Sequence, residues 1–155
     1  MRLTRQSHTL YRYPTIVSLA GLPPPVGLDG TDLSPLFTNP TTRLKTAAYS
    51  EYPRCPKNIS TPWDDTTSCV HTERAQFTAM GYSVRTDEWR YTVWLHWDGN
   101  RLVGDFSQPP IGVELYSHQG DDGTDFDAFE NENVVHDNPD VAEQIHALAV
   151  AHWSK

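Results

Sequence analysis

The clearest periodic pattern in the chain lies between residues 78 and 97. Two runs rich in aromatic and β-branched residues, 78–86 and 89–97, are separated only by Asp87 and Glu88, which is typical of two strands joined by a tight hairpin. Successive side chains of a strand point to opposite faces. We therefore expect one alternating set to lie in the core and the other to be half exposed: Trp89, Tyr91, Val93, Leu95 and Trp97 against Arg90, Thr92, Trp94 and His96.

Shorter patterns predict three more elements around this hairpin. Residues 46–52 and 112–116 suit strands, and Asn138 suits the N-cap of a terminal helix with Pro139 at its first position. Asp140 and Glu143 then lie near the positive end of that helix. Its expected apolar stripe is Val141, Ile145, Leu148 and His152 or Trp153. The pattern predicts an α+β fold, a small antiparallel sheet of three or four strands with a C-terminal helix packed on one face.

The first third of the chain has a different pattern. Residues 13–21 are typical of a short helix with Pro14 in the first turn and Gly21 just past the end. Ile16, Leu19 and Ala20 share one face of this helix, which we expect to be buried. A proline-rich loop with an Asp-Gly turn follows at 22–30, and a helical turn is expected near 32–37.

Charge limits the classes of partner. The formal net charge is −8, which argues against a nucleic-acid partner because phosphate contacts need a basic face. Residues 1–57 carry a net charge of +4, 58–111 of −3 and 112–155 of −9. The basic first third could face an anionic ligand or be an ordinary mixed surface. No stretch is apolar enough to span a membrane, so no membrane partner is expected, and the first residues lack the apolar core of a signal peptide.

The two cysteines and one sequon point to an oxidising compartment. Cys55 and Cys69 fit no zinc-binding spacing, and a disulfide between them would close a proline-rich loop and contribute about 3 kcal/mol. Asn58 begins an N-glycosylation sequon, Asn58-Ile59-Ser60. Both features are typical of secretory-pathway proteins. Because no signal peptide accompanies them, we expect that the front of a longer protein is missing from this sequence.

Several segments resemble the sulfatase family of the alkaline-phosphatase-like superfamily. Segments 13–16, 19–22, 27–30 and 33–36 resemble the part that joins the two sulfatase subdomains, and 84–87, 89–91, 114–116, Glu130 and Asn133 resemble the C-terminal subdomain. Segments 49–56 and 80–86 are similar to sulfatases that act on 2-O-sulfated uronic acid in glycosaminoglycans. The resemblance weakens between Ser117 and Phe129, where this chain has an acidic insert.

This resemblance implies a division into 1–43, which joins to a missing N-terminal catalytic subdomain, and 44–155, the C-terminal subdomain. Sulfatases hydrolyse sulfate esters with a formylglycine made within a Cys/Ser-x-Pro-x-Arg motif, and neither Cys55 nor Cys69 begins that motif. The family's calcium ligands lie upstream in the catalytic subdomain. We therefore expect no catalytic residue and no cofactor in this chain, which would be inactive alone, and a calcium-dependent parent that is lysosomal or secreted.

The best candidates for contact with an anionic sulfated sugar are Glu51, Tyr52 and Arg54. They follow a strand end, and a guanidinium suits sulfate or carboxylate. Arg54 could equally pair with an acid of the missing subdomain, and both interpretations stay open. For Arg85 and Arg90 we favour structural ion pairs.

Three other interpretations concern exposed groups or the whole chain. The acidic run 121–127 lacks the glycine position of an EF-hand, so a solvated loop is favoured over a calcium site. Trp94 could belong to a sugar-stacking platform, although a core role or contact with the missing subdomain is favoured. As alternatives to an enzyme part, the chain could be a stand-alone module that binds anionic sugars through Arg54 and Lys57, or a truncated product that does not fold stably alone.

Overall fold

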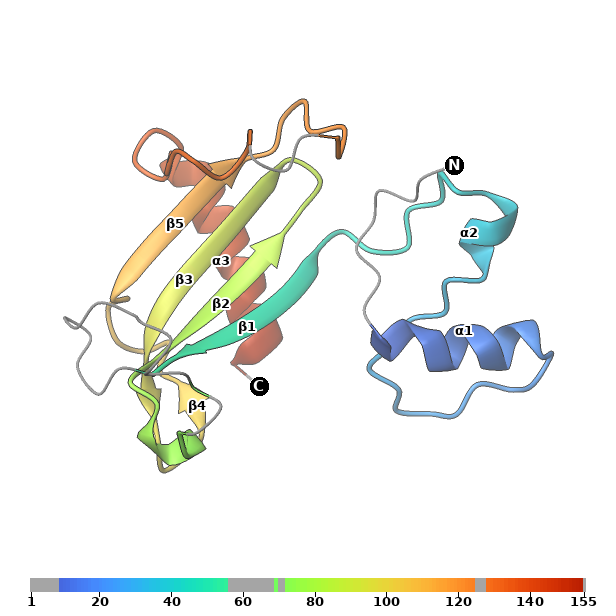
Figure 1. The fold of residues 1–155 in the computed structure, drawn as a ribbon, viewed down its shortest axis with the longest axis horizontal. Helices are drawn as coiled ribbons and strands as arrows, with labels where there is room; N and C mark the ends of the chain where they lie inside the picture. Colours follow the sequence, from blue (N-terminus) through green and yellow to red (C-terminus); the bar gives the residue numbers. More distant parts are fainter. Residues whose placement is uncertain (1–8, 56–68, 70–71, 125–127, 155) are drawn as a thin grey trace. The chain divides into compact units, whose positions relative to one another are not determined.

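The structure is a computed structural model that describes residues 9–55, 69, 72–124 and 128–154 (Figure 1). The chain divides into two compact units, Met1–Thr46 and Ala47–Lys155. The first unit is helical, and the second contains the sheet and the terminal helix.

The first unit contains a short helix where the sequence predicts one. A single 3-10 turn, η1 (Thr9–Tyr11), runs directly into α1 (Arg12–Leu19), and α2 (Pro35–Thr38) follows the proline-rich loop. The helix ends because Gly21 adopts φ +68°, a left-handed conformation that favours glycine. The amide of Leu22 then donates to the carbonyl of Val17 at 3.1 Å. The predicted helix end and the predicted turn near 32–37 are both confirmed.

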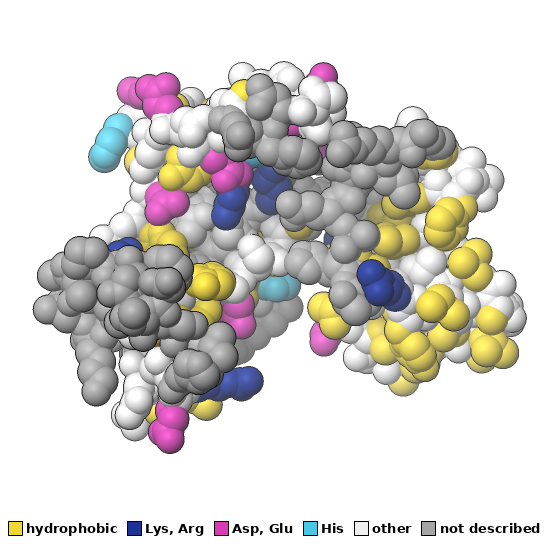
Figure 2. Space-filling model, in the orientation of Figure 1, with side chains coloured by type: hydrophobic (Ala, Val, Ile, Leu, Met, Phe, Trp, Pro, Cys, Tyr) yellow, Lys and Arg dark blue, Asp and Glu magenta, His cyan; other side chains and the backbone are white. Residues whose placement is uncertain are grey.

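The predicted buried face of α1 is wrong. Pro14, Thr15 and Val17 are buried, whereas Ile16 and Leu19 are 64% and 62% exposed. The reason is a polar anchor, since the Thr15 hydroxyl donates to the Tyr11 carbonyl at 2.5 Å and accepts from the Leu33 amide at 2.9 Å. That anchor turns the threonine side of the helix toward the following loop. The larger side chains are left outside, and Figure 2 shows hydrophobic side chains gathered over the first unit.

The second unit confirms the predicted α+β class, with five strands instead of three or four. The sheet is antiparallel, its main strands lie in the order β1-β2-β3-β5, and β4 pairs with the end of β3. A long helix, α3, packs across one face of the sheet and lies behind the strands in Figure 1. The elements are β1 (Ala48–Arg54), η4 (Arg74–Gln76), β2 (Ala79–Arg85), β3 (Trp89–Asp98), β4 (Val103–Gly104), β5 (Gly112–Ser117) and α3 (Pro139–Trp153).

The predicted hairpin joins β2 to β3. Arg85 pairs with Arg90 at its end, and the Thr86 amide donates to the Trp89 carbonyl at 2.8 Å across the two turn residues. This register fixes which side chains share a face. The positions predicted for the core do point inward: Tyr91, Val93 and Leu95 are almost fully buried, and Trp89 and Trp97 are partly buried against the same cluster.

Thr92 is an exception on the opposite face, because it is buried where half exposure was expected. Its hydroxyl donates to the Ser83 hydroxyl at 3.0 Å across the β2–β3 pair. A buried hydroxyl with a hydrogen-bond partner avoids the desolvation cost that would otherwise expel it from this position.

The terminal helix begins where it was predicted to begin, and its predicted stripe is confirmed in part. Ile145 is buried, and Val141 and Trp153 pack against the core, but Leu148 does not. Asn138 occupies the N-cap position, yet its side-chain amide donates to the Val134 carbonyl at 3.0 Å and makes no capping bond. The buried positions are Ala142, Ile145 and Ala149, whereas Leu148 is 37% exposed. Small alanines let a helix backbone approach a sheet closely, which explains why the larger leucine lies outside the interface.

Aromatic side chains hold the C-terminal end of α3 against the sheet. Trp153, which was predicted as one of two alternatives for the end of the apolar stripe, is among them. The Trp153 ring lies 4.8 Å from the Tyr82 ring and 5.5 Å from the Tyr49 ring, centroid to centroid. Further back on α3, the Tyr91 hydroxyl lies 2.9 Å from Nδ1 of His146. Burial raises the pKa of Tyr91 to about 12, so this hydroxyl keeps its proton at neutral pH.

Asn133 occupies the outer edge of β5. Its Oδ1 accepts from the Leu115 amide at 3.0 Å, and its Nδ2 donates to the Val113 carbonyl at 3.1 Å. The Val134 amide adds a bond to the Leu115 carbonyl at 2.9 Å. The segment before α3 therefore pairs with three outer backbone groups of β5, the Leu115 amide and the Val113 and Leu115 carbonyls, much as another strand would.

Candidate functional site

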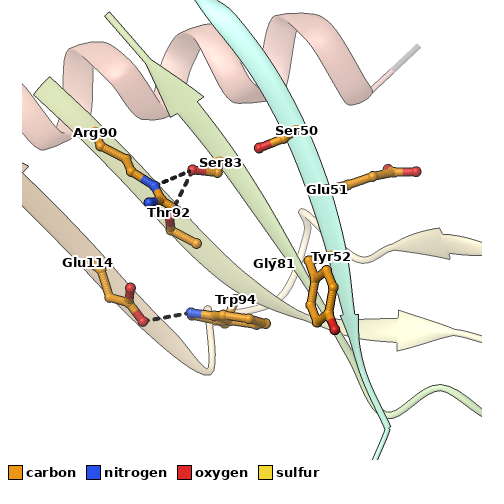
Figure 3. Close-up of a pocket in the computed structure, with 9 residues that line it drawn as sticks. All are labelled: Ser50, Glu51, Tyr52, Gly81, Ser83, Arg90, Thr92, Trp94 and Glu114. Carbon is orange, nitrogen blue, oxygen red and sulfur yellow. Dashed lines mark hydrogen bonds between the residues drawn. The ribbon is translucent and has the colours of Figure 1, made fainter. Parts of the chain in front are cut away.

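A shallow hollow of about 250 Å³ lies on the sheet face opposite α3. All four main strands contribute to it, because their registers place these residues in neighbouring rows. Figure 3 shows the hollow with its lining: Ser50, Glu51, Tyr52, Gly81, Ser83, Arg90, Thr92, Trp94 and Glu114.

The indole of Trp94 is fixed on two sides. Gly81 lies directly opposite on β2, and a Cβ atom at that position would come within 2.7 Å of the ring. The absence of a side chain at Gly81 therefore makes room for the ring against the sheet. On the other side, Nε1 of Trp94 donates to Oε1 of Glu114 at 2.8 Å. Because one partner is charged, this bond is stronger than an ordinary one and holds the ring in place.

Polar side chains line the other part of the hollow. Nε of Arg90 donates to the Ser83 hydroxyl at 3.3 Å, close to the bond from Thr92 (Figure 3). The other end of the Arg90 guanidinium forms an ion pair with Glu130. Tyr116 reaches Oε2 of Glu114 at 3.3 Å, and burial followed by that carboxylate raises the Tyr116 pKa.

An ionic network continues from the hollow along the end of the sheet. The buried ring of His118 lies between two carboxylates, with Nδ1 2.8 Å from Asp121 and Nε2 2.8 Å from Glu130. The hydrogen bond from His118 is the main reason why the pKa of Asp121 lies below its ordinary value. Asp121 also lies 3.5 Å from Arg85.

Both hairpin arginines thus have acidic partners, as the structural ion-pair interpretation predicts. Arg85 faces Asp121 and Arg90 faces Glu130. Burial lowers the pKa of Arg85, and the nearby acids oppose that shift. Glu130 adopts φ +69°, a left-handed conformation that is uncommon for a residue with a side chain. Its two bonds, to His118 and Arg90, favour that local backbone geometry.

The three predicted sugar-contact residues separate in the structure. Tyr52 is 63% exposed and lines the hollow beside Trp94. Glu51 contributes to the rim, but its side chain points away from the other lining side chains in Figure 3. It lies opposite Tyr82, where burial and then the Glu51 charge raise the tyrosine pKa. Arg54 does not line the hollow, and its Nε is buried without a hydrogen-bond partner among the described residues.

Cys55 and Cys69 form a disulfide with a Cα–Cα separation of 5.3 Å. The bond ties the end of β1 to the loop that precedes η4, directly beside Arg54. Asn58, the predicted glycosylation position, lies outside the described residues. The sequon therefore stays a prediction.

The described residues contain no cluster of three or more side chains suited to a metal ion. Within the acidic run, Asp121 is engaged by His118 and Arg85, and Asp122 accepts from the amide and hydroxyl of Thr124. Positions 125–127 lie outside the described residues. Among the described residues, no helix is both long and apolar enough to cross a membrane.

Known proteins resemble this chain along most of its length. It is 30% identical over 149 residues to iduronate 2-sulfatase of Mus musculus, an alignment that covers 81% of this chain and 24% of that protein. It is 33% identical over 91 residues to iduronate 2-sulfatase of Homo sapiens, which covers 59% of this chain and 14% of that protein. The chain resembles the C-terminal part of a sulfatase. No protein-family model matches it.

The similarity bears out the resemblance inferred from the sequence motifs. This sulfatase-like chain spans about a quarter of the mouse enzyme.

Several residues of the hollow escaped the sequence analysis. Gly81 and Glu114 belong to motifs that carry the sulfatase resemblance, yet nothing local shows that they contact Trp94. The register of the β2–β3 and β3–β5 pairs could have identified them, because it places Gly81 on one side of the indole and Glu114 on the other.

Proposed function

We propose that this sulfatase-like chain is the C-terminal subdomain of an enzyme that hydrolyses sulfate esters on the uronic acids of glycosaminoglycans. Its role would be to form one wall beside the substrate and to stabilise the catalytic subdomain. The observation that carries the proposal is the similarity to two iduronate 2-sulfatases, which extends over 81% of this chain for the mouse enzyme.

The chemistry of the described residues supports a structural role and not a catalytic one. Sulfate ester hydrolysis in the family needs a formylglycine, and Cys55 is committed to a disulfide with Cys69. Calcium in such an enzyme would polarise the sulfate. The described residues contain no cluster of side chains suited to that ion. Asp121 and Glu130 are bound by Arg85, Arg90 and His118, and Glu114 accepts hydrogen bonds from Trp94 and Tyr116. The chain alone should therefore not release sulfate.

The exposed surface of the first unit supports contact with a larger protein. Large apolar side chains lie outside on α1 and on the segments that follow it, and Val26 is 99% exposed. Contiguous exposed apolar surface is typical of an interface. The exposed set comprises Leu10, Tyr13, Ile16, Leu19, Leu22, Val26 and Phe37. A parent enzyme would be lysosomal or secreted, where a disulfide such as Cys55–Cys69 persists.

The test has two parts. The 5′ end of the transcript is sequenced to look for an in-frame Cys/Ser-x-Pro-x-Arg motif and a signal peptide upstream of Met1. The 155-residue chain and the longer product are then assayed with a 2-sulfated iduronate substrate. The proposal expects sulfate release by the longer product alone. A genuine start at Met1 with no upstream coding sequence, or a longer product without sulfatase activity, would overturn it.

A second function is favoured by one observation, the buried Arg54 Nε that lacks a hydrogen-bond partner among the described residues. Such a group could complete its bonding with the sulfate or carboxylate of a sugar, in a module that binds without chemistry. Retention of the chain on heparin at physiological salt, lost in Arg54→Ala and kept in Arg101→Ala, would support this function. Equal elution of all three proteins would exclude it.

A further inference from the structure

We infer that the hollow centred on Trp94 is a binding subsite for an uncharged sugar ring, held by its C–H face and its hydroxyl groups. The inference extends the proposed function from the reacting sulfate to a neighbouring sugar of the same polymer, and rests on it for that placement. The binding itself follows from the geometry of the hollow and can be tested without any reaction.

The first argument is the preorganised aromatic surface. Gly81 supports the Trp94 ring from the sheet side, and Glu114 fixes its Nε1 at 2.8 Å. Tyr52, with 63% of its surface exposed, stands beside it (Figure 3). Aromatic rings offer a large apolar contact area. Because the indole is already immobilised, little side-chain entropy is lost when a ligand stacks on it.

The second argument is the arrangement of polar groups around that surface. The exposed Ser50 supplies a hydroxyl, Glu114 supplies a carboxylate, and Arg90 supplies guanidinium donors. Each sugar hydroxyl both donates and accepts hydrogen bonds, so a mixed set of this kind suits several of them. A pocket with an apolar surface and a few placed polar groups is typical of small-molecule sites.

The third argument is charge, which separates this hollow from a sulfate site. The positive charge of Arg90 is matched by its ion pair with Glu130. Glu114 adds a negative charge inside the hollow, whereas the Glu51 side chain at the rim points away from it. A sulfate or carboxylate would face Glu114, and the described lining of the hollow offers no unpaired cation to balance the two negative charges. The hollow therefore favours a neutral ring over an anionic one.

The size of the hollow sets how much of a polymer it can hold. Its volume of about 250 Å³ is below the range of about 300–1,000 Å³ typical of drug-sized ligands. One pyranose ring is an occupant of suitable size. A protein partner would instead favour a broad apolar surface. Seven of the nine lining residues are charged or carry a hydroxyl, namely Ser50, Glu51, Tyr52, Ser83, Arg90, Thr92 and Glu114.

The experiment titrates the full 155-residue chain with N-acetylglucosamine and, separately, with glucuronic acid. Binding is followed by tryptophan fluorescence and by ¹H–¹⁵N NMR shifts at two salt concentrations. We expect saturable binding of N-acetylglucosamine that salt does not weaken, and weaker binding of glucuronic acid. Trp94→Ala and Tyr52→Ala should each bind about tenfold more weakly, a typical loss for a central aromatic contact.

His96→Ala is the matched control, because His96 lies on the same face of β3 but outside the hollow and is exposed. It should bind like the wild type. Tyr52 is largely exposed, so Tyr52→Ala keeps the test valid even if Trp94→Ala does not fold.

Three results would overturn the inference. The first is no saturable binding of N-acetylglucosamine, or binding that both aromatic variants retain. The second is tighter, salt-sensitive binding of glucuronic acid, which would make the hollow an anion site. The third is a dimeric mass in solution that Trp94→Ala converts to a monomer, which would mean that a second copy covers this face. Failure of the proposed function has a different signature, namely a longer product that releases no sulfate while this chain still binds the neutral sugar.

Discussion

Replacing Gly81 with alanine places a methyl group against the ring of Trp94. The new Cβ would lie 2.7 Å from a ring carbon, whereas ordinary contact begins at 3.4 Å. The ring must therefore move, and the neighbouring strands restrict its movement. Overpacking of this kind costs about 1–3 kcal/mol. Displacement also weakens the bond from Nε1 to Glu114, and hydrogen bonds to charged groups are worth about 1.5–3 kcal/mol.

One effect opposes this loss. Alanine restricts the unfolded chain more than glycine does, which stabilises the fold by about 0.5–1 kcal/mol where the backbone permits it. Gly81 is not among the glycines with positive φ, so its backbone accepts alanine. We expect a net loss in the free energy of unfolding of about 2 kcal/mol. Urea unfolding followed by far-UV circular dichroism measures it.

Two companion variants make the test specific. Gly112→Ala is the matched control, because its Cβ would lie 3.9 Å from the same indole, an ordinary contact. It should leave stability unchanged or raise it by up to about 1 kcal/mol. In a Trp94→Ala background the obstacle is gone, so adding Gly81→Ala should cost nothing. If Gly81→Ala is as stable as the wild type, or if its cost persists without the indole, the packing argument is refuted.

Three further predictions concern the core, the sheet edge and acid stability. Leu95→Ala should lower the free energy of unfolding by about 3 kcal/mol because the Leu95 side chain is 1% exposed. The control Leu148→Ala, on the outside of α3, should lower it far less. Equal losses for the two variants in urea unfolding would contradict the assignment of Leu95 to the core. Asn133→Ala should lower the free energy of unfolding by about 1–2 kcal/mol because it loses two hydrogen bonds to β5. Asn133→Asp should lose less because it keeps the acceptor oxygen. An Asn133→Ala variant as stable as the wild type would argue against the role of Asn133 at the edge of the sheet. The pKa of Asp121 is lowered from 3.8 in the folded protein, so its ionised form stabilises the fold at pH values above 3.8, and this stabilisation is lost as the pH falls through the folded pKa. Between about pH 5 and pH 3, the free energy of unfolding of Asp121→Asn should therefore fall less than that of the wild type. Parallel pH profiles for the two proteins would reject this linkage.

The sheet could be predicted from the sequence because its signals are local. The period of two across β3 identified its core face, and the two-residue turn identified the hairpin. Strand alternation is a fixed geometric property, so a single well-patterned strand determines both faces of the sheet around it.

The helices were less predictable, because size misled the choice of buried residues. Leu148 is larger than Ala149, yet Ala149 is fully buried against the sheet. On α1, the Thr15 hydroxyl accepts a hydrogen bond from the amide of Leu33, which lies on a later segment, and this contact sets which side of the helix is buried. Short helices carry few apolar positions, so one tertiary hydrogen bond outweighs their pattern.

The hollow could be predicted only in part, because its contacts span strands. Tyr52, a predicted sugar contact, lines the hollow, although it lies within β1 and not after the end of a strand. Trp94 lies on the half-exposed face of β3, as predicted. The contact between Gly81 and Trp94 depends on the exact register of two strands, which sequence does not specify at single-residue precision. The bonds of His118 to Asp121 and Glu130 join irregular segments that have no period at all.

The two edges of the sheet bear on how this unit behaves at high concentration. Open strand edges are templates on which other chains can add, and this is a common route to fibrils. On the β5 side, Asn133 and Val134 already occupy the Leu115 amide and the Val113 and Leu115 carbonyls, which an incoming strand would need. On the β1 side, Pro53 has no amide hydrogen to offer, and the exposed Glu51 places a charge on the same strand. Templated growth is thus opposed at both edges of the sheet, so the second unit should resist strand-by-strand self-association at high concentration.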